Sequence, residues 1–197
     1  MSELLDALKA GLANKIQKQP HKLGELTFVT EPSELGYVAA FLHNKLEFNS
    51  LIDITAVHYP ERQLPFEIVY HFLSIARNER LRLKVSAAEE SLIPSLCEIY
   101  PVANWYEREV YDMFGLTFDK HPKMERLLTD DGFEGHPLRK DFPVHGEKDI
   151  HFNEDSGCVE YGALDLPQPT RDYHFENPWH APHYVLPGDE KAKRGRK

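Results

Sequence analysis

The chain has 197 residues, 41% of them hydrophobic and 28% charged, so its composition predicts a soluble globular protein rather than a disordered one. Its longest clean apolar run, Val38 to Leu42, is far shorter than the roughly 20 residues that a membrane-spanning helix needs. Cys97 and Cys158 are the only cysteines, which excludes a disulfide framework, a four-cysteine zinc site and an iron–sulfur cluster held by this chain alone. The acidic N-terminus lacks the pattern of a signal peptide, so we expect a cytosolic-type protein.

The formal net charge of −9 is unevenly distributed along the chain. The last ten residues hold five bases and two acids, a net +3, so the first 187 residues carry −12. Duplex nucleic acid is an unsuitable partner for such a body, because binding it requires many basic contacts to phosphate. The basic end, residues 191–197, could contact anionic lipid or RNA, but a solvated terminus is the simpler interpretation.

The first third of the chain predicts two helices and a strand. Leu4, Leu8, Leu12 and Ile16 recur at helical spacing and indicate an amphipathic helix that Pro20 ends. Residues 26–30 favour a short strand. Pro32 suits the first position of a second helix, which we expect to run to about residue 44.

The next segments predict an antiparallel hairpin and a further strand. Residues 51–59 and 66–75 are rich in β-branched and aromatic side chains and are separated by a turn with a proline at each end. Residues 80–85 alternate strictly, which places Leu81, Leu83 and Val85 on the buried face. We therefore expect an α+β fold, with helices packed on a mixed or antiparallel sheet.

A third helix is predicted from Pro101 to about Phe114, with Gly115 placed to cap its end. Beyond residue 117 the regular periods fade, and residues 143–187 contain six of the 14 prolines. We predict a domain over residues 1–143, followed by an extended proline-rich arm over residues 144–197 that becomes ordered on a partner surface.

Common catalytic and cofactor motifs are absent from the sequence. There is no glycine-rich nucleotide loop, no H-E-x-x-H and no C-x-x-C. His180 and His183 are candidates for a metal pair, but Pro182 between them denies them the i, i+4 geometry of a helix, and no third ligand is evident. We expect the chain to bind no metal.

The predicted third helix carries the densest cluster of polar residues. At 100° per residue, one stripe holds Val102, Tyr106, Val110 and Met113 and is expected to face the core.

An adjoining stripe holds Trp105, Arg108, Glu109 and Asp112, in which Arg108 and Asp112 are spaced to form an ion pair. Three interpretations remain open for it. Glu109 and Asp112 are a possible acid/base pair, as in glycosidases. Alternatively, the charges pair with one another at the margin of the helix, or the stripe contacts another protein through Trp and Arg.

Residues 121–143 predict a rigid edge rather than a flexible catalytic loop. His121 and His136 each precede a proline, which disfavours helical backbone at the histidine. Arg139, Lys140 and Asp141 place opposite charges side by side on a segment that the prolines are expected to hold extended. Such a segment suits a docking edge.

Several of these motifs, in this order, resemble one known family. They are Glu107-Arg-Glu-Val-Tyr-Asp-Met-Phe-Gly115, His121-Pro, Arg126-Leu-Leu and Glu134-Gly-His-Pro-Leu-Arg-Lys-Asp-Phe-Pro143. Together with residues 51–56 and 69–74, they resemble the C subunit of NADH:quinone oxidoreductase, which is the 30 kDa subunit of respiratory complex I, over roughly residues 26–143. Residues 171–179 resemble the C-terminal arm of the mitochondrial and related bacterial members.

The resemblance implies a scaffold protein in the hydrophilic arm, with no catalytic residue of its own. FMN, the iron–sulfur clusters, NADH and quinone would be bound by other subunits. The implied partners are the D subunit, which forms the quinone cavity, and the neighbouring B subunit, on the cytoplasmic side of the bacterial inner membrane or the matrix side in mitochondria. Contact with the membrane would be only through the complex.

From the residues and the resemblance together we predict a set of interface residues. They are Trp105, Arg108, Glu109, Asp112, His136, Arg139, Lys140, Asp141, Phe175 and Trp179. Two alternatives remain: the matching subunit of a membrane-bound hydrogenase or related dehydrogenase, and a free-standing hydrolase that uses Glu109 and Asp112.

Overall fold

The fold is that of a computed structural model, which describes residues 2–12, 15–20, 25–130, 132–143, 146 and 148–164. The chain divides into two compact units, Met1–Val144 and His145–Lys197. Among the described residues, no helix is long and apolar enough to cross a membrane.

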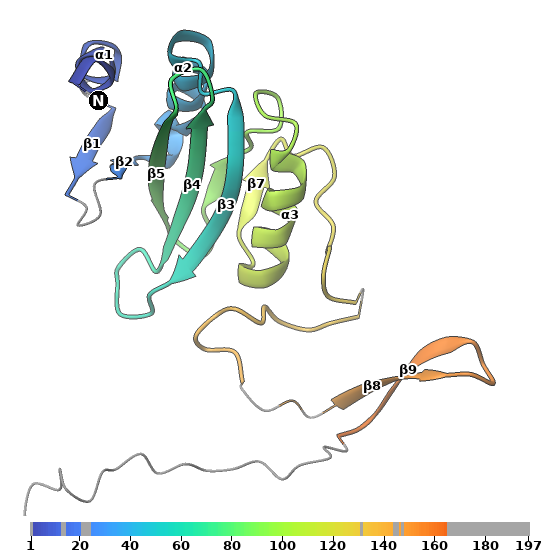
Figure 1. The fold of residues 1–197 in the computed structure, drawn as a ribbon. Coiled ribbons are helices and arrows are strands. Elements are labelled where there is room, and N and C mark those ends of the chain that lie inside the picture. The colour runs from blue at the N-terminus through green and yellow to red at the C-terminus, as the bar shows by residue number, and fades with distance from the viewer. Residues whose placement is uncertain are drawn as a thin grey trace, which may run out of the picture. The chain divides into compact units, whose positions relative to one another are not determined.

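The first unit is built on a five-stranded mixed sheet with strand order β1-β2-β5-β4-β3 (Figure 1). The strands are β1 (Ile16–Gln19), β2 (Leu26–Thr30), β3 (Ser50–His58), β4 (Phe66–Ser74) and β5 (Glu79–Ala87). β2 and β5 are parallel, whereas the other neighbouring pairs are antiparallel. The predicted strand at 26–30, the hairpin and the strand at 80–85 are confirmed.

One face of this sheet is buried and the other is largely polar. Phe28, Leu83, Tyr70 and Ile54 lie beside one another across four strands, and each is at most 4% exposed. The opposite face carries side chains such as Arg82. An antiparallel or mixed sheet with one apolar face must bury that face under other elements.

Helices cover the apolar face and share one hydrophobic core with it. They are α1 (Ser2–Leu12), α2 (Leu35–Leu46) and α3 (Ala103–Phe114), whereas the short 3₁₀ helix η1 (Pro32–Glu34) leads into α2 and buries no residue. In Figure 1, α3 lies alongside β3, with which it makes extensive contacts. The predicted α+β class, with helices packed on a mixed sheet, is confirmed.

The first predicted helix is wrong in its second half. α1 ends at Leu12, and Ile16 begins strand β1, where it lies opposite Thr30 of β2. Pairing with β2 satisfies the backbone of residues 16–19, so sheet hydrogen bonding prevails over the helical spacing of Ile16.

Two short strands flank α3 and were not predicted. β6 (Leu92–Pro94) precedes the helix and pairs in parallel with β7 (Thr117–Asp119), which follows it. The helix itself is confirmed, and so is its cap: Gly115 has φ +80° and donates its N–H to the carbonyl of Tyr111 at 2.8 Å. The two strands join the chain segments that precede and follow α3.

In the second unit, the described residues form an antiparallel hairpin of β8 (Lys148–Asn153) and β9 (Cys158–Ala163). Sequence periodicity predicts only an extended arm for this region. The aromatic residues Phe175 and Trp179, the histidines at 180 and 183, and the basic end at 191–197 lie outside the described residues.

Candidate functional site

Helix α3 buries a different set of residues from the predicted stripe. Val110 and Met113 lie in the core as expected, but Val102 precedes the first turn and is 41% exposed. Glu107 is instead fully buried. The buried face is centred nearer to Glu107 than the prediction places it, and the Glu107 carboxylate finds hydrogen-bond donors in the loop after β6.

Asp112, on the same helix, holds the following loop in place. Its buried carboxylate accepts the N–H groups of Leu127, Leu128 and Thr129 at 3.0, 2.7 and 2.9 Å, and also the Thr129 hydroxyl. Arg126 pairs with the same carboxylate at 2.8 Å. Such a set of donors fixes three successive backbone units of the loop against α3.

The pKa of Asp112 follows from these bonds. Burial alone would raise it, but the hydrogen bonds from the Thr129 hydroxyl and from the three backbone N–H groups outweigh burial and lower it well below its usual range. The carboxylate is therefore ionised at neutral pH.

The predicted pair between Arg108 and Asp112 is wrong. Arg108 instead donates to the backbone carbonyls of Glu125 and Arg126, both at 3.1 Å. Its guanidinium also lies 5.5 Å from the ring centre of Trp105. Arg108 therefore binds the beginning of the same loop that Asp112 holds one turn later.

Arg126 connects the loop to itself. Besides Asp112, it donates to the Thr129 hydroxyl at 3.0 Å and to the carbonyl of Gly135 at 3.2 Å, and it lies over the ring of Phe133. One guanidinium thus joins the helix, the first part of the following loop and the turn at Gly135. We call residues 125–142 the clamped loop.

His136 closes the C-terminal end of α3. Its Nδ1–H donates to the carbonyl of Asp112 at 2.9 Å, and the N–H of Leu138 donates to the carbonyl of Met113 at 3.1 Å. Carbonyls in the last turn of a helix lack partners within the helix, so the clamped loop supplies them. His136 also lies so close to Gly115 that any Cβ there would come within 2.6 Å of its ring.

The segment after His136 is turned rather than extended, contrary to the prediction. The N–H groups of Arg139 and Phe142 each bond back to the carbonyl three residues earlier. Arg139 pairs with Asp141 at 3.0 Å and with Glu89, which lies just beyond β5. Its charge is thus paired within the chain, and the residue holds the clamped loop to the sheet domain.

Lys140 takes part in the same attachment through its backbone. Its N–H donates to Nδ1 of His58 at 3.0 Å, at the end of β3. His58 is buried and stacks on Phe66.

The residues that face solvent near α3 form a mixed surface. Trp105 is 59% exposed, Leu128 64% and Leu138 52%, and Glu109 is also exposed. We call Trp105, Arg108, Glu109, Leu128 and Leu138 the α3 face. Leu128 and Leu138 were not predicted as interface residues, although both lie within the motifs that carry the family resemblance.

An acid/base pair of Glu109 and Asp112 does not fit this geometry. Asp112 is fully buried and already accepts five hydrogen bonds, whereas Glu109 is exposed on the helix. A general acid must reach its substrate and hold a proton near neutral pH, and the lowered pKa of Asp112 opposes the second requirement.

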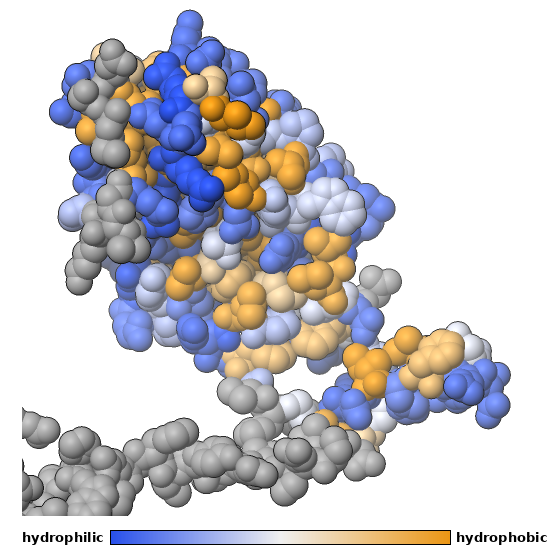
Figure 2. Space-filling model, in the orientation of Figure 1, coloured by the Kyte–Doolittle hydropathy of each residue, from blue (hydrophilic) through white to orange (hydrophobic). Residues whose placement is uncertain are grey.

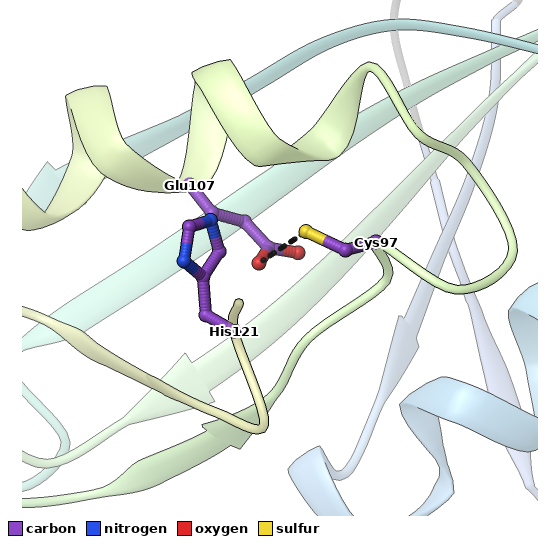
Figure 3. Close-up of side chains that lie close together, drawn as sticks. All are labelled: Cys97, Glu107 and His121. Carbon is purple, nitrogen blue, oxygen red and sulfur yellow. Dashed lines mark hydrogen bonds between the residues drawn. The ribbon is translucent and has the colours of Figure 1, made fainter. Parts of the chain in front are cut away.

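Cys97, Glu107 and His121 bring metal-capable atoms to within 4.8 Å of one another (Figure 3). The Glu107 carboxylate accepts the Ser95 hydroxyl at 2.7 Å, the Leu96 N–H at 2.7 Å and the Cys97 thiol at 3.6 Å. Burial raises the pKa of Cys97 to about 11, which opposes formation of the thiolate that a metal needs.

The third member of this cluster, His121, is engaged at both ring nitrogens. One lies 3.1 Å from the carbonyl of Asn104, and the other accepts the N–H of Lys123 at 3.1 Å. These contacts describe a network that ties the loop after β6 to α3. The absence of a metal remains a prediction.

Glu107→Gln is expected to change how stability depends on pH. Burial raises the pKa of Glu107, despite the lowering effect of the Leu96 N–H and the Ser95 hydroxyl. The folded state therefore binds the proton more tightly than the unfolded chain, so its contribution is complete below about pH 4.3 and is lost as pH rises through the folded pKa.

The glutamine variant should therefore gain stability relative to the native chain as pH rises above about 4.3. Urea unfolding at a series of pH values measures the difference. A difference that stays constant with pH would show that burial does not raise the pKa of Glu107.

Comparisons with known proteins converge on one description. A family model described as "Respiratory-chain NADH dehydrogenase, 30 Kd subunit" matches residues 28–148. The NADH-quinone oxidoreductase C subunit of Chelativorans sp. (strain BNC1) is 45% identical over 98% of this chain and 98% of its own. The C subunit of Mesorhizobium japonicum is also 45% identical, over 98% of this chain and 97% of its own.

Two solved structures share the fold. A trypsin-resistant fragment of Nqo5 matches with a TM-score of 0.56 and 28% identity, covering 61% of this chain and 98% of the fragment. A chain of the membrane-bound sulfane sulfur reductase, an archaeal respiratory membrane complex, matches with a TM-score of 0.61 and 26% identity, covering 73% of this chain and 85% of its own.

Proposed function

Because the chain belongs to the family of the 30 kDa subunit of respiratory-chain NADH dehydrogenase, we propose that it acts as a non-catalytic scaffold in the hydrophilic arm of a proton-pumping NADH:quinone oxidoreductase. FMN, iron–sulfur clusters, NADH and quinone are then bound by other subunits. The chain lies on the cytoplasmic side of the bacterial inner membrane and reaches the membrane only through the complex.

The observation that carries this proposal is that the polar residues of the family motifs form hydrogen bonds and ion pairs that hold the clamped loop. Arg126 bonds to the Asp112 carboxylate and to the Gly135 carbonyl, and His136 bonds to the Asp112 carbonyl. Arg139 pairs with Asp141 and Glu89. A rigid loop presents a fixed surface, which is what a protein that positions other subunits requires.

We further propose that the α3 face docks on the D subunit, which forms the quinone cavity, with the B subunit as a neighbour. Trp and Arg are typical anchors of protein interfaces, and Trp105 and Arg108 provide such a pair. Exposed Leu128 and Leu138 add apolar area that docking can bury, and the clamped loop fixes both of them. Of the predicted interface residues, Asp112, His136 and Arg139 then support the surface from beneath or beside it.

The docking proposal predicts a large effect of Leu128→Asp on assembly. Placing a charge at a desolvated anchor costs about 2 kcal/mol or more, which lowers affinity roughly 30-fold. The measurement is purification of the tagged full chain from native membranes in mild detergent, with the other subunits quantified. Ile75→Asp is the control, because Ile75 is 77% exposed on the turn between β4 and β5.

Equal recovery of the other subunits with both variants would exclude the α3 face as the docking surface. If subunits assemble normally but NADH:quinone activity per complex is lost, the scaffold role itself is wrong.

The likeness to the sulfane sulfur reductase chain favours one second candidate. In this second candidate function, the chain is the equivalent scaffold subunit of a different membrane-bound respiratory enzyme, such as a hydrogenase or a related dehydrogenase. The identities of the co-purified chains distinguish the two.

A further inference from the structure

The hairpin of the second unit has two chemically different faces. In its antiparallel register, Ile150 lies opposite Tyr161 and Phe152 lies opposite Val159. Because side chains alternate along a strand, these four residues share one face. The other face carries Asp149, His151, Asn153 and Glu160.

The apolar face is open to solvent. Ile150 is 45% exposed, Phe152 63%, Val159 53% and Tyr161 49%. Figure 2 shows apolar side chains gathered along one side of the hairpin and hydrophilic ones at its turn. Contiguous apolar side chains at this level of exposure indicate an interaction surface.

The turn of the hairpin is well formed, so the register that produces the apolar face is fixed. Asn153 accepts the N–H of Asp155 at 2.9 Å and donates its side-chain amide to Glu160 at 3.0 Å. Gly157 supplies the positive φ of +65° that the turn needs. A two-stranded hairpin is nevertheless only marginally stable alone in water, because it buries little apolar surface.

We propose that the hairpin face formed by Ile150, Phe152, Val159 and Tyr161 docks on an apolar surface of another protein subunit of the same complex. This inference rests on the proposed scaffold function and adds a second contact, separate in sequence from the α3 face.

The charge of the surrounding chain argues against a membrane as the occupant. Residues 144–187 carry eight acids and two bases, so an anionic lipid surface repels this segment. The size of the face argues against a second copy of the chain. Stable dimers bury about 800 Å² and 20 to 30 residues on each partner, far more than one face of two six-residue strands supplies.

The relatives support a protein partner. Those named as the C subunit match over 98% of this chain, so the matched region spans the hairpin. The family model, in contrast, ends at residue 148, where the hairpin begins. A segment shared among subunits of this kind, yet outside the common domain, is a reasonable place for an additional subunit contact.

The test compares substitutions to serine on opposite faces of one strand. Phe152→Ser removes the most exposed of the four apolar side chains on the hairpin face, and His151→Ser changes its neighbour on the polar face. Val159→Ser repeats the change on the other strand. We expect Phe152→Ser and Val159→Ser to reduce the recovery of the other subunits about tenfold or more, and His151→Ser to leave it within about twofold.

Several outcomes would overturn the inference. Normal recovery with Phe152→Ser and Val159→Ser, or equal loss with all three variants, would exclude a face-specific contact. Dimerisation of the purified full chain, or its binding to phosphatidylglycerol vesicles, would identify a different occupant if Phe152→Ser abolished it. If the native chain itself recovers no other subunit, the proposed scaffold function is wrong. That result is independent of the hairpin variants.

Discussion

Replacing Asp112 with alanine should destabilise the first unit by about 3–5 kcal/mol. The change removes the partner of Arg126 and leaves the N–H groups of Leu127, Leu128 and Thr129 without their acceptor. The Asp112 side chain is fully buried and the Arg126 side chain is 19% exposed, so most of the loss comes from the N–H groups that lose their acceptor, at about 1–3 kcal/mol for each one that stays buried. Urea unfolding of the native and variant chains measures the loss, which is a large part of the stability of a typical domain.

Glu109→Ala is the matched control for this experiment. Glu109 lies on the same helix, three residues earlier, and is exposed, so its removal should change stability by less than about 0.5 kcal/mol. Similar losses for both variants would show that Asp112 contributes only through helix formation.

The effect of Asp112 should also fade in acid. Burial raises the folded pKa of Asp112, but the hydrogen bonds to its carboxylate outweigh burial and lower this pKa below the unfolded value of about 3.9. Its contribution is therefore complete above that value and is lost as pH falls through the folded pKa. The stability difference between the native chain and Asp112→Ala should be constant from about pH 5 to 8 and shrink below about pH 4. A difference that persists undiminished in acid would mean that the protonated carboxyl holds the loop as well.

Four of the five strands of the sheet and two of the three helices were predictable because their patterns are local. Leu81, Leu83 and Val85 alternate with basic residues, and Gly115 follows a helix of regular period. The fate of Ile16 was not predictable, because its helical spacing competes with a partner strand that begins ten residues later in the chain. Neither was β6, whose partner β7 lies beyond α3.

The candidate site shows the same limit at the level of side chains. Arg108 and Asp112 are four residues apart, the spacing of an ion pair on a helix, yet both bond to groups of the clamped loop instead. A sequence pattern gives the distance between two side chains on one helix, but not which backbone donors a folded loop brings to them. Three N–H groups and a guanidinium outcompete a single neighbouring arginine.

These contacts also explain why one loop carries so many of the motifs. Asp112 holds its beginning, His136 caps the helix from its end, and Arg139 ties its last turn to Glu89. Exposed Leu128 and Leu138 then project from backbone that is bonded directly to α3. Anchors on rigid backbone lose less conformational entropy on docking than anchors on a free loop.

Replacing Gly115 with alanine should destabilise the first unit by about 1.5–3.5 kcal/mol, for two separable reasons. The residue has φ +80°, where an L side chain costs about 1–2 kcal/mol. The added Cβ would also lie 2.6 Å from Nε2 of His136, so the ring must move and release the carbonyl of Asp112, at a further cost of about 0.5–1.5 kcal/mol.

A double-mutant cycle with His136→Ala separates these two contributions. In the His136→Ala background the ring is already gone, so Gly115→Ala should cost only the backbone part, about 1–2 kcal/mol. The difference between the two backgrounds measures the clash, and thermal and urea unfolding both report it. If Gly115→Ala lowers stability equally in both backgrounds, the His136 ring moves aside at no cost. The contact between the clamped loop and the end of α3 then contributes nothing to the rigidity on which docking depends.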